Sequence, residues 1–472
     1  MSYEIRADYG QRYLFPPSLE EWVGEDHPAR FIREFVDALE LEELGFGVRS
    51  SRDGRPNYAG DLLLKVWLYG YMSRIYSTRG LERACREHVS LLWLTGMHAP
   101  DHNTLWRFWR DNKAGLREVF KRAVGLALEW DMVGMVLHAV DGTKIAADVS
   151  KRRAWHREDL EKLLERLDGV LEEAELEVEG AQQYELGEYR LPEKLQDAER
   201  LREAIRDALS ELDRANRDHL HPSDGDARMM RCEGKTVFAY NAQAVVDAES
   251  GLVVAQEVVN EESDRGQLTG MLEEVEQVVG ETAERTVADA GYGSGEELTR
   301  AGERGYEVVV NLGETVNPRG NDKEFHASKF AYDAERDCCV CPRGEELSFE
   351  RTKLGRHKRY RVRVYRCHHW RRCAVRWQCS RDKRGRMIEI GPYHGALVHQ
   401  RVKQREPANR EALEKRKVIV EPVFGVIKHV RGFRRWTVRG IEGVKTQWSL
   451  VCTAHNLLKL RRKWGAGMQM PT

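Results

Sequence analysis

Short apolar runs alternate with amphipathic stretches between residues 135 and 310, and this alternation restricts the fold more than any other feature of the chain. Residues 135–140 form an apolar run that predicts a buried strand. Residues 236–246 and 252–255 flank a Ser-Gly turn and predict a β-hairpin. Helical patterns follow at 268–279 and 295–301, and strand patterns at 286–289 and 306–310. The order strand, hairpin, helix, strand, helix, strand predicts a mixed α/β architecture.

The segments around these strands differ in character. Residues 1–130 have a mostly helical pattern, and Pro100 and Asp101 precede a helix rich in aromatic residues and arginines. That helix resembles a recognition helix, although an amphipathic helix packed by its own tryptophans is at least as good an interpretation. Residues 157–218 carry leucines at helical spacing with 20 acidic against 10 basic residues. They predict an acidic helical hairpin that serves as a spacer or protein contact and not for DNA binding.

Charge is distributed unevenly along the 472 residues, although the net charge is only −1. From Arg351 to the end there are 32 Lys and Arg against 7 Asp and Glu, whereas the first 350 residues hold 44 against 70. An excess of this size predicts binding to a polyanion, and we expect nucleic acid ahead of lipid. A solvated basic face is the alternative.

Hydropathy argues against a membrane protein. No apolar run approaches the ~18 residues that span a bilayer. The first six residues are polar and lack the apolar core of a signal peptide. We therefore expect a cytoplasmic protein without membrane contact.

Six of the nine cysteines lie between Cys338 and Cys379. Structural disulfides are rare inside cells, so the crowding favours a metal. The four candidate ligands for a tetrahedral zinc ion are Cys341, Cys367, Cys373 and Cys379. The last three are spaced more widely than in a Cys-x2-Cys knuckle, and reduced, partly buried thiols are an equally good interpretation.

Three acidic residues stand at the edges of expected elements. Asp141 and Asp289 are expected where strands end, and Glu421 is expected to open a helical run over residues 421–428. Three carboxylates that converge from separate elements can hold two Mg²⁺ ions about 3.5–4 Å apart for in-line phosphoryl displacement. Most of the 77 acidic residues are nevertheless expected to be solvated surface groups.

Several ordered motifs together resemble the DDE-type insertion-sequence transposases, whose catalytic domain is RNase H-like. The resemblance covers nearly the whole chain. Its motifs are Pro100-Asp101-His102-Asn103-Thr104, Val140-Asp141-Gly142-Thr143-Lys144, Tyr240-Asn241-Ala242-Gln243, Ala288-Asp289-Ala290-Gly291-Tyr292, and Val420-Glu421-Pro422-Val423-Phe424-Gly425 with Lys428.

The resemblance implies roles for four of these residues. Asp141, Asp289 and Glu421 would form the metal-binding triad for two Mg²⁺ ions, with Mn²⁺ as a substitute, and Lys428 would face the DNA backbone. Positions 421 and 428 are two turns apart and share a helix face.

One family signature is only half present. Family members with a β-rich insertion carry Tyr-x2-Arg-x3-Glu-x6-Lys, whereas this chain has Glu414, Lys417, Glu421 and Lys428 at those places. Lys417 keeps a positive charge but not the fork of an arginine. Pro422 favours a kink or a helix start beside Glu421.

The domain organisation follows from these segments. The 131 residues between Asp289 and Glu421 exceed what an RNase H-like core needs and predict an inserted subdomain. We expect an all-α, DNA-binding-like N-terminal domain (1–130), a catalytic core (131–156, 230–314 and 401–465), an acidic helical insertion (157–229) and a β-rich insertion with cysteines and arginines (315–400).

The basic C-terminal region contains candidate DNA contacts. Trp370 and Trp377 lie among four arginines, a pattern that favours stacking on an unpaired base beside phosphate-binding guanidinium groups. Ordinary core tryptophans are the competing interpretation. Arg434 and Arg435 belong to an arginine cluster that follows the segment carrying Glu421 and Lys428.

The sequence therefore predicts a DNA transposase that cleaves at the ends of a mobile element and joins the 3′-OH to target DNA. The expected partners are duplex DNA with terminal inverted repeats, target DNA and a second copy of the chain. The alternatives are a silent or domesticated DNA-binding protein derived from a transposase, and an RNase H-like nuclease without strand transfer.

Overall fold

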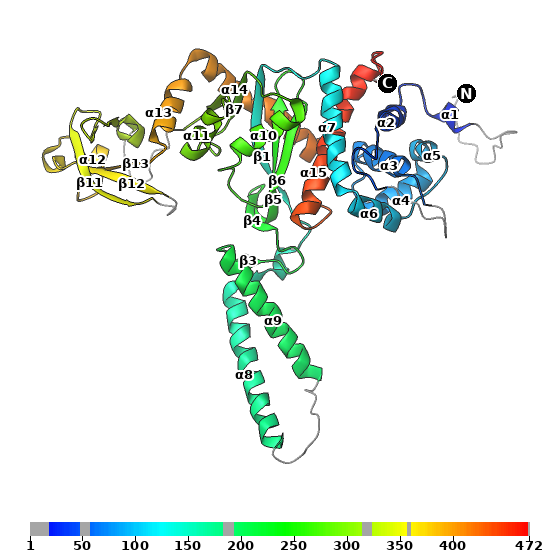
Figure 1. Cartoon of the computed structure of the whole chain (residues 1–472), viewed down its shortest axis with the longest axis horizontal. Coiled ribbons are helices and arrows are strands. Elements are labelled where there is room, and N and C mark those ends of the chain that lie inside the picture. The colour runs from blue at the N-terminus through cyan, green and yellow to red at the C-terminus, as the bar shows by residue number, and fades with distance from the viewer. Residues whose placement is uncertain (1–17, 48–56, 183–192, 314–322, 356–359, 471–472) are drawn as a thin grey trace, which may run out of the picture.

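The computed structural model describes residues 18–47, 57–182, 193–313, 323–355 and 360–470. The first six residues, on which the expected cytoplasmic location partly depends, lie outside these ranges. A mixed sheet stands at the centre of the molecule, with helices of the N-terminal third on one side and a smaller β-sheet on the other (Figure 1). No helix in the described ranges combines the length and the apolar character that a bilayer crossing requires.

Among the described residues, six strands form the central sheet: β1 (Leu137–Ala146), β4 (Arg228–Cys232), β5 (Lys235–Asp247), β6 (Val253–Val259), β7 (Arg285–Ala288) and β8 (Val308–Val310). β5 pairs antiparallel with β4, β6 and β1, whereas β1, β7 and β8 run parallel to one another. The expected mixed α/β fold with an RNase H-like sheet is confirmed.

The central strand β1 is longer than expected. Antiparallel pairing with β5 continues from His138 opposite Asp247 to Ala146 opposite Ala239. The expectation that Asp141 ends a strand is therefore wrong, because the polar residues after it still have a pairing partner. Asp289, in contrast, directly follows β7, as expected.

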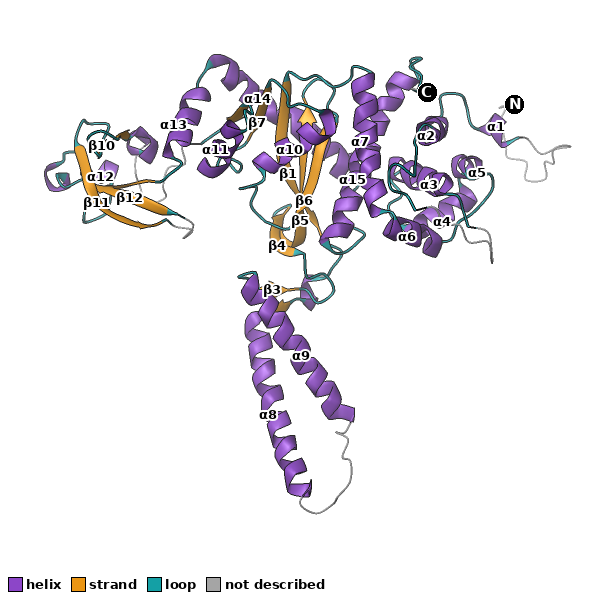
Figure 2. Cartoon of the chain, in the orientation of Figure 1, coloured by secondary structure: helices purple, strands orange, loops and turns teal. Residues whose placement is uncertain are grey.

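Three described helices of the core pack on the sheet: α10 (Leu268–Val279), α14 (Pro407–Gly425) and α15 (Ile441–Trp464). A fourth, α11 (Gly295–Glu303), packs on α10. α15 contacts β6 and joins the sheet to the N-terminal helices through α7 (Figure 2). On α15 the indole Nε1 of Trp448 donates to the carbonyl oxygen of Gln243 at 2.9 Å. Because Trp448 is fully buried, this bond fixes the helix against the strand that lies beside Asp141.

The described part of the N-terminal third contains seven helices: α1 (Leu19–Trp22), α2 (Pro28–Asp37), α3 (Gly60–Met72), α4 (Thr78–Glu87), α5 (Val89–Leu94), α6 (His102–Asp111) and α7 (Lys113–Glu129). The Asp101 side chain caps α6 by accepting the N–H of Thr104 at 2.6 Å. Trp109 on α6 is buried, whereas Trp106 is exposed and stacks on it. One apolar core runs from these helices into the central sheet.

Two insertions interrupt the core. α8 (Arg157–Gln182) and α9 (Glu193–Arg214) form a hairpin that extends away from the body in Figure 1, with β2 (Trp155–His156) and β3 (His219–Leu220) paired at its base. The second sheet has the order β13 (Met387–Ile390), β12 (Arg361–Arg366), β11 (Glu346–Leu354), β10 (Cys338–Val340) and β9 (Ala331–Asp333). Both insertions have apolar cores of their own.

Short helical segments complete the second insertion and its return to the sheet. They are η2 (Lys323–Phe325), η3 (Ala327–Lys329), η4 (Trp370–Arg372), α12 (Arg376–Cys379) and α13 (His394–Lys403), with η1 (Lys151–Arg153) following β1. α13 leads directly into α14.

Candidate metal and DNA site

Asp141 and Asp289 come from neighbouring parallel strands. The register places Ala139 of β1 opposite Val287 of β7, so that Asp141 and Asp289 are at equivalent heights two residues further on. Burial raises the pKa of the Asp141 carboxyl above its ordinary value, and the negative charge of Asp289 raises it further. The structure therefore brings these two carboxylates close enough to influence each other.

A glycine follows close behind each of these aspartates. The N–H of Gly142 donates to Oδ1 of Asp141 at 2.8 Å, and the N–H of Gly291 donates to Oδ1 of Asp289 at 2.8 Å. One oxygen of each carboxylate is thus held by its own backbone. The other oxygen of each can turn toward a different partner.

Arg416 on α14 is the partner of Asp141. Its Nη1 donates to Oδ2 of Asp141 at 2.7 Å, and both side chains are largely shielded from solvent. Together with the Gly142 N–H, this guanidinium counteracts part of the burial effect on the Asp141 pKa. Sequence analysis did not single out Arg416, because nothing in its local pattern relates it to a residue 275 positions away.

Glu421 lies near the end of α14 and not at a helix start. α14 begins at Pro407 and continues through Pro422 to Gly425, followed by a π-helical turn, η5 (Val426–Val430). The expected helix start beside Glu421 is therefore wrong. The carbonyl of Val418, which loses its partner at Pro422, belongs to a residue that is 75% exposed, so water can satisfy it.

The Glu421 side chain is exposed, and it is on the helix segment between Arg416 and Lys428, both of which reach β1. Lys428 Nζ donates to the carbonyl oxygen of Lys144 at 2.8 Å, and burial lowers the Lys428 pKa. Within the described ranges no three carboxylate, histidine or cysteine side chains stand in a geometry that holds a metal ion. The structure thus brings Asp141 and Asp289 together without placing Glu421 in contact with both.

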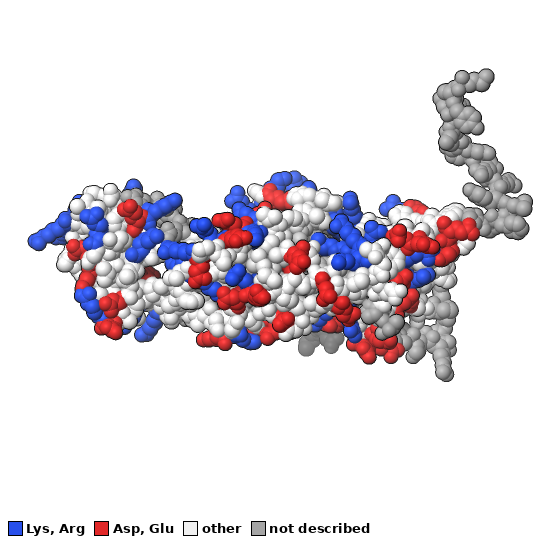
Figure 3. All heavy atoms as spheres, turned by 90° about the horizontal axis from the view of Figure 1, so that it is seen from above, with Lys and Arg blue, Asp and Glu red and all other residues white. Residues whose placement is uncertain are grey.

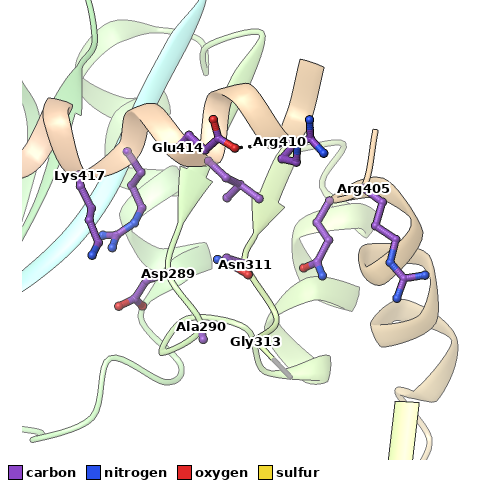
Figure 4. Close-up of a pocket in the computed structure, with 11 residues that line it drawn as sticks. Asp289, Ala290, Asn311, Gly313, Arg405, Arg410, Glu414 and Lys417 are labelled. Carbon is purple, nitrogen blue, oxygen red and sulfur yellow. Dashed lines mark ion pairs between the residues drawn. The ribbon is translucent and has the colours of Figure 1, made fainter. Parts of the chain in front are cut away.

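A pocket of about 630 Å³ opens beside Asp289 (Figure 4). Asp289, Ala290, Asn311 and Gly313 line one wall, and Gln404, Arg405, Arg410, Leu413, Glu414, Arg416 and Lys417 line the other. Glu414 and Lys417, where the chain departs from the family signature, both face this pocket. Four of its residues are basic and two are acidic, so the pocket favours an anion next to the carboxylates.

The predicted arginine contacts are at the surface. Arg434 is exposed, and its Nη2 lies 2.8 Å from Nδ1 of His429. Arg435 is exposed as well, and its Nη1 donates to the carbonyl oxygen of Ala147, just after β1. Both therefore lie near the strand that carries Asp141.

The two predicted tryptophans flank one arginine in the second insertion. The Arg376 guanidinium carbon is 5.8 Å from the ring centre of Trp370 and 4.2 Å from that of Trp377. Trp377 is 63% exposed, which excludes a core role for it. On the face shown in Figure 3, basic side chains crowd the end formed by this insertion, at the left of the view.

The four predicted zinc ligands gather at one corner of the insertion. Cys341 Sγ accepts the N–H groups of Arg343 and Glu345, each at 3.3 Å. Burial raises the pKa of Cys379 to about 11, and the other three thiols contribute to the rise. None of the four forms a disulfide. Like the carboxylates, these thiols are not already arranged around a metal in the part of the chain that the structure describes.

Comparison with known protein families gives two matches. The family model described as transposase DDE domain matches residues 340–461, and the one described as transposase domain (DUF772) matches residues 17–111. The first match begins at the end of β10 and includes the rest of the second insertion, α14 and most of α15; the second ends with α6. A search of curated proteins finds no match. The two family matches, together with the RNase H-like sheet, indicate an insertion-sequence transposase of the DDE type.

Proposed function

We propose that the protein cleaves DNA at the ends of a mobile element and joins the freed 3′-OH to target DNA, with Asp141, Asp289 and Glu421 as metal ligands. The observation that carries the proposal is the placement of Asp141 and Asp289 at equivalent heights on two central parallel strands. The transposase family matches make DNA the expected substrate and a divalent metal such as Mg²⁺ the expected cofactor.

The donor atoms fit a hard cation. Asp141 and Asp289 offer only oxygen, and Arg416 already supplies a positive charge to Asp141. When bound, two Mg²⁺ ions, or Mn²⁺ in their place, supply the charge that activates the attacking oxygen and stabilises the leaving oxygen. Arg416 binds Oδ2 of Asp141, so it must turn away before that oxygen can bind a metal ion.

Glu421 is the third ligand in this proposal because its helix is anchored to β1 on both sides of it. Arg416 on α14 and Lys428 on η5 each form a hydrogen bond to β1, one before and one after Glu421. A rotation of the Glu421 side chain, or a small shift of the last turn of α14 where Pro422 and the π turn interrupt regular bonding, would bring its carboxylate toward the pair.

DNA would approach over the basic surfaces. Arg434 and Arg435 would bind phosphates near β1, Lys428 would lie beside the scissile strand, and Trp370 and Trp377 would stack on an unpaired base. The substrates would be duplex ends with terminal inverted repeats and a target duplex, held by two copies of the chain. The N-terminal domain (1–130) and the β-rich insertion (315–400) would hold DNA, and the acidic hairpin would contact protein.

We also propose a structural zinc ion in the β-rich insertion. Four thiols from three separate parts of the insertion meet beside one small core, and backbone N–H groups already point at Cys341 Sγ. N–H···S bonds of this kind stabilise a thiolate ligand. Closing a tetrahedral site would require the thiols to draw together.

The proposed chemistry is tested with a labelled duplex that carries an element end, found from inverted repeats around the reading frame. Asp141→Asn, Asp289→Asn and Glu421→Gln should each reduce Mg²⁺-dependent cleavage and joining by at least ~10³-fold while end binding persists. The control is Glu411→Gln on the same helix, whose carboxylate pairs with Lys415 at the surface. Cleavage that persists in one of the three variants removes that residue from the triad.

A further inference from the structure

A fourth carboxylate, that of Asp264, lies near the glycines that follow Asp141 and Asp289. Asp264 lies in the loop between β6 and α10, and its side chain is 18% exposed. It belongs to none of the sequence motifs and has no part in the proposed chemistry. Its carboxylate nevertheless accepts a hydrogen bond from the strand of Asp141 and lies near the loop of Asp289.

Three donors from two strands converge on one oxygen of Asp264. Oδ1 accepts hydrogen bonds from Lys144 Nζ at 3.0 Å, Asn241 Nδ2 at 2.7 Å and Gln243 Nε2 at 2.9 Å. Lys144 Nζ also donates to Oδ2 at 3.1 Å. Lys144 belongs to β1, and both amides belong to β5, so this carboxylate ties the loop to the two longest strands of the sheet.

Gly142 leaves room for the Asp264 carboxylate, and Gly291 lies within ordinary contact distance of the same side chain. A Cβ atom on Gly142 would stand 2.6 Å from Asp264 Oδ1 and 2.4 Å from Gln243 Nε2. A Cβ atom on Gly291 would stand 3.5 Å from Asp264 Cβ and 2.9 Å from Asp289 Oδ1. The backbone N–H groups of these same glycines hold Asp141 and Asp289. Asp264 therefore packs closely against the peptide unit that orients Asp141 and lies beside the one that orients Asp289.

A tyrosine extends the network to the loop after β7. The hydroxyl of Tyr292 donates to Oε1 of Gln243, whose Nε2 donates to Asp264. Tyr292 is fully buried, and burial raises its pKa, with further contributions from the charges of Asp264, Asp141 and Asp289. The carbonyl oxygen of Lys144 accepts a hydrogen bond from Lys428 Nζ. This bond connects the network to the helical region that carries Glu421.

We propose that Asp264 is a positioning residue that fixes the spacing and orientation of Asp141 and Asp289 for metal binding. It acts through Lys144, Asn241 and Gln243 and not as a ligand, because Oδ1 accepts three donors and the Lys144 ammonium group also occupies Oδ2. Partners that orient metal ligands in this way usually contribute about 10- to 100-fold to metal affinity. The inference rests on the proposed function, because it takes the two aspartates as the ligands.

The test measures Mn²⁺ binding to the free full-length protein by electron paramagnetic resonance, together with its melting temperature. Asp264→Asn should weaken Mn²⁺ binding by at least about tenfold. The control is Asp247→Asn, which removes a fully buried carboxylate at the other end of the β1–β5 pair, where it accepts two hydrogen bonds from Ser250. Asp264→Asn should bind Mn²⁺ less tightly than Asp247→Asn even where both melt at the same temperature.

A second variant covers the case in which Asp264→Asn does not fold. Gly142→Ala keeps every residue of the network but displaces the Asp264 carboxylate and the Gln243 amide, so it should also weaken Mn²⁺ binding. A Mn²⁺ titration of either folded variant that superimposes on that of the unchanged protein overturns the inference.

Asp141→Asn and Asp289→Asn separate the inference from the proposed function. If these two variants bind Mn²⁺ as tightly as the unchanged protein, the proposed function fails. If they lose Mn²⁺ binding while Asp264→Asn retains it, the positioning role alone fails.

Discussion

The guanidinium of Arg416 donates a 2.7 Å hydrogen bond to Asp141 Oδ2, the oxygen that the backbone leaves available for a metal ion. A hydrogen bond between charged, shielded groups contributes about 1.5–3 kcal/mol. Arg416 and the metal would therefore compete for Asp141. Arg416→Gln should increase the Mn²⁺ affinity of the DNA-free protein by about 10- to 100-fold, measured by electron paramagnetic resonance.

Arg410→Gln is the matched control for this prediction. Arg410 lines the same pocket, but its nearest acidic partner is Glu414 at 3.9 Å, on the exposed side of α14. Arg410→Gln removes the same positive charge from the pocket as Arg416→Gln does, but it leaves the hydrogen bond to Asp141 intact. Equal Mn²⁺ affinities for the two variants would show that Arg416 acts only through general charge.

The arginines that follow η5 should determine much of the salt dependence of DNA binding. Neutralising one phosphate-binding group reduces the slope of log K against log[salt] by about 0.9 on duplex DNA. Replacing Arg434 and Arg435 together by alanine should therefore flatten the slope by up to ~2, as measured by fluorescence anisotropy over a range of salt concentrations. An unchanged slope would mean that both are solvated surface groups.

Trp377→Ala provides the contrast within the same experiment. Because Trp377 is 63% exposed, its replacement should leave the melting temperature unchanged. Binding to DNA with an unpaired base should weaken by roughly 1–3 kcal/mol with little change in the salt slope. A parallel decrease of the salt slope would place Trp377 among groups that act through phosphate and not through stacking.

Sequence analysis predicted the elements that depend on neighbouring residues and missed those that depend on residues far apart in the chain. The helix α10 has the bounds expected from its periodicity, because local spacing and the left-handed Gly280 that follows it define both ends. β1 was expected to stop at Asp141, because the residues that follow are polar and their pairing partner in β5 lies about a hundred residues further along. Local patterns could not reveal that partner.

The residues around the ligands were missed for the same reason. Arg416 and Asp264 meet the β1 region only after the chain has folded, and neither carries a distinctive local motif. Only Gly142 and Gly291 offered a local signal, since each lies within two residues of an expected ligand. Glycines at those positions indicate a close approach by another group, but they do not identify it.

Zinc analysis tests the proposed site in the second insertion. Protein purified under reducing conditions should contain about one zinc per chain, and Cys373→Ser should lose it, because three thiolates leave the tetrahedral shell incomplete. Cys232→Ser, which changes a half-buried thiol on β4, should retain the metal. Chelation should unfold residues 315–400 before the central sheet, as followed by hydrogen exchange. An absence of zinc from freshly purified protein would leave the four cysteines as ordinary reduced thiols.

His455 should make the stability of the core sensitive to acid. It is buried on α15, where Nε2 lies 3.1 Å from the carbonyl oxygen of Gly251, and burial lowers its pKa to about 4, with Lys459 and Arg431 adding to the effect. Because the unfolded chain takes up a proton near pH 6.5, lowering the pH favours unfolding until the folded pKa is reached. The contribution of His455 to the free energy of unfolding should fall by about 2 kcal/mol between pH 7 and pH 5, since each unit of pKa shift corresponds to about 1.36 kcal/mol.

The measurement compares urea unfolding of the unchanged protein, His455→Gln and the exposed-site control His399→Gln at both pH values. Other groups also titrate in this range, so the informative quantity is the difference between proteins in their loss of stability on acidification. His455→Gln should be less stable at pH 7 because a packed, hydrogen-bonded ring is lost, yet it should lose about 2 kcal/mol less than the other two on going to pH 5. If all three proteins lose the same free energy, His455 does not remain neutral in the folded core.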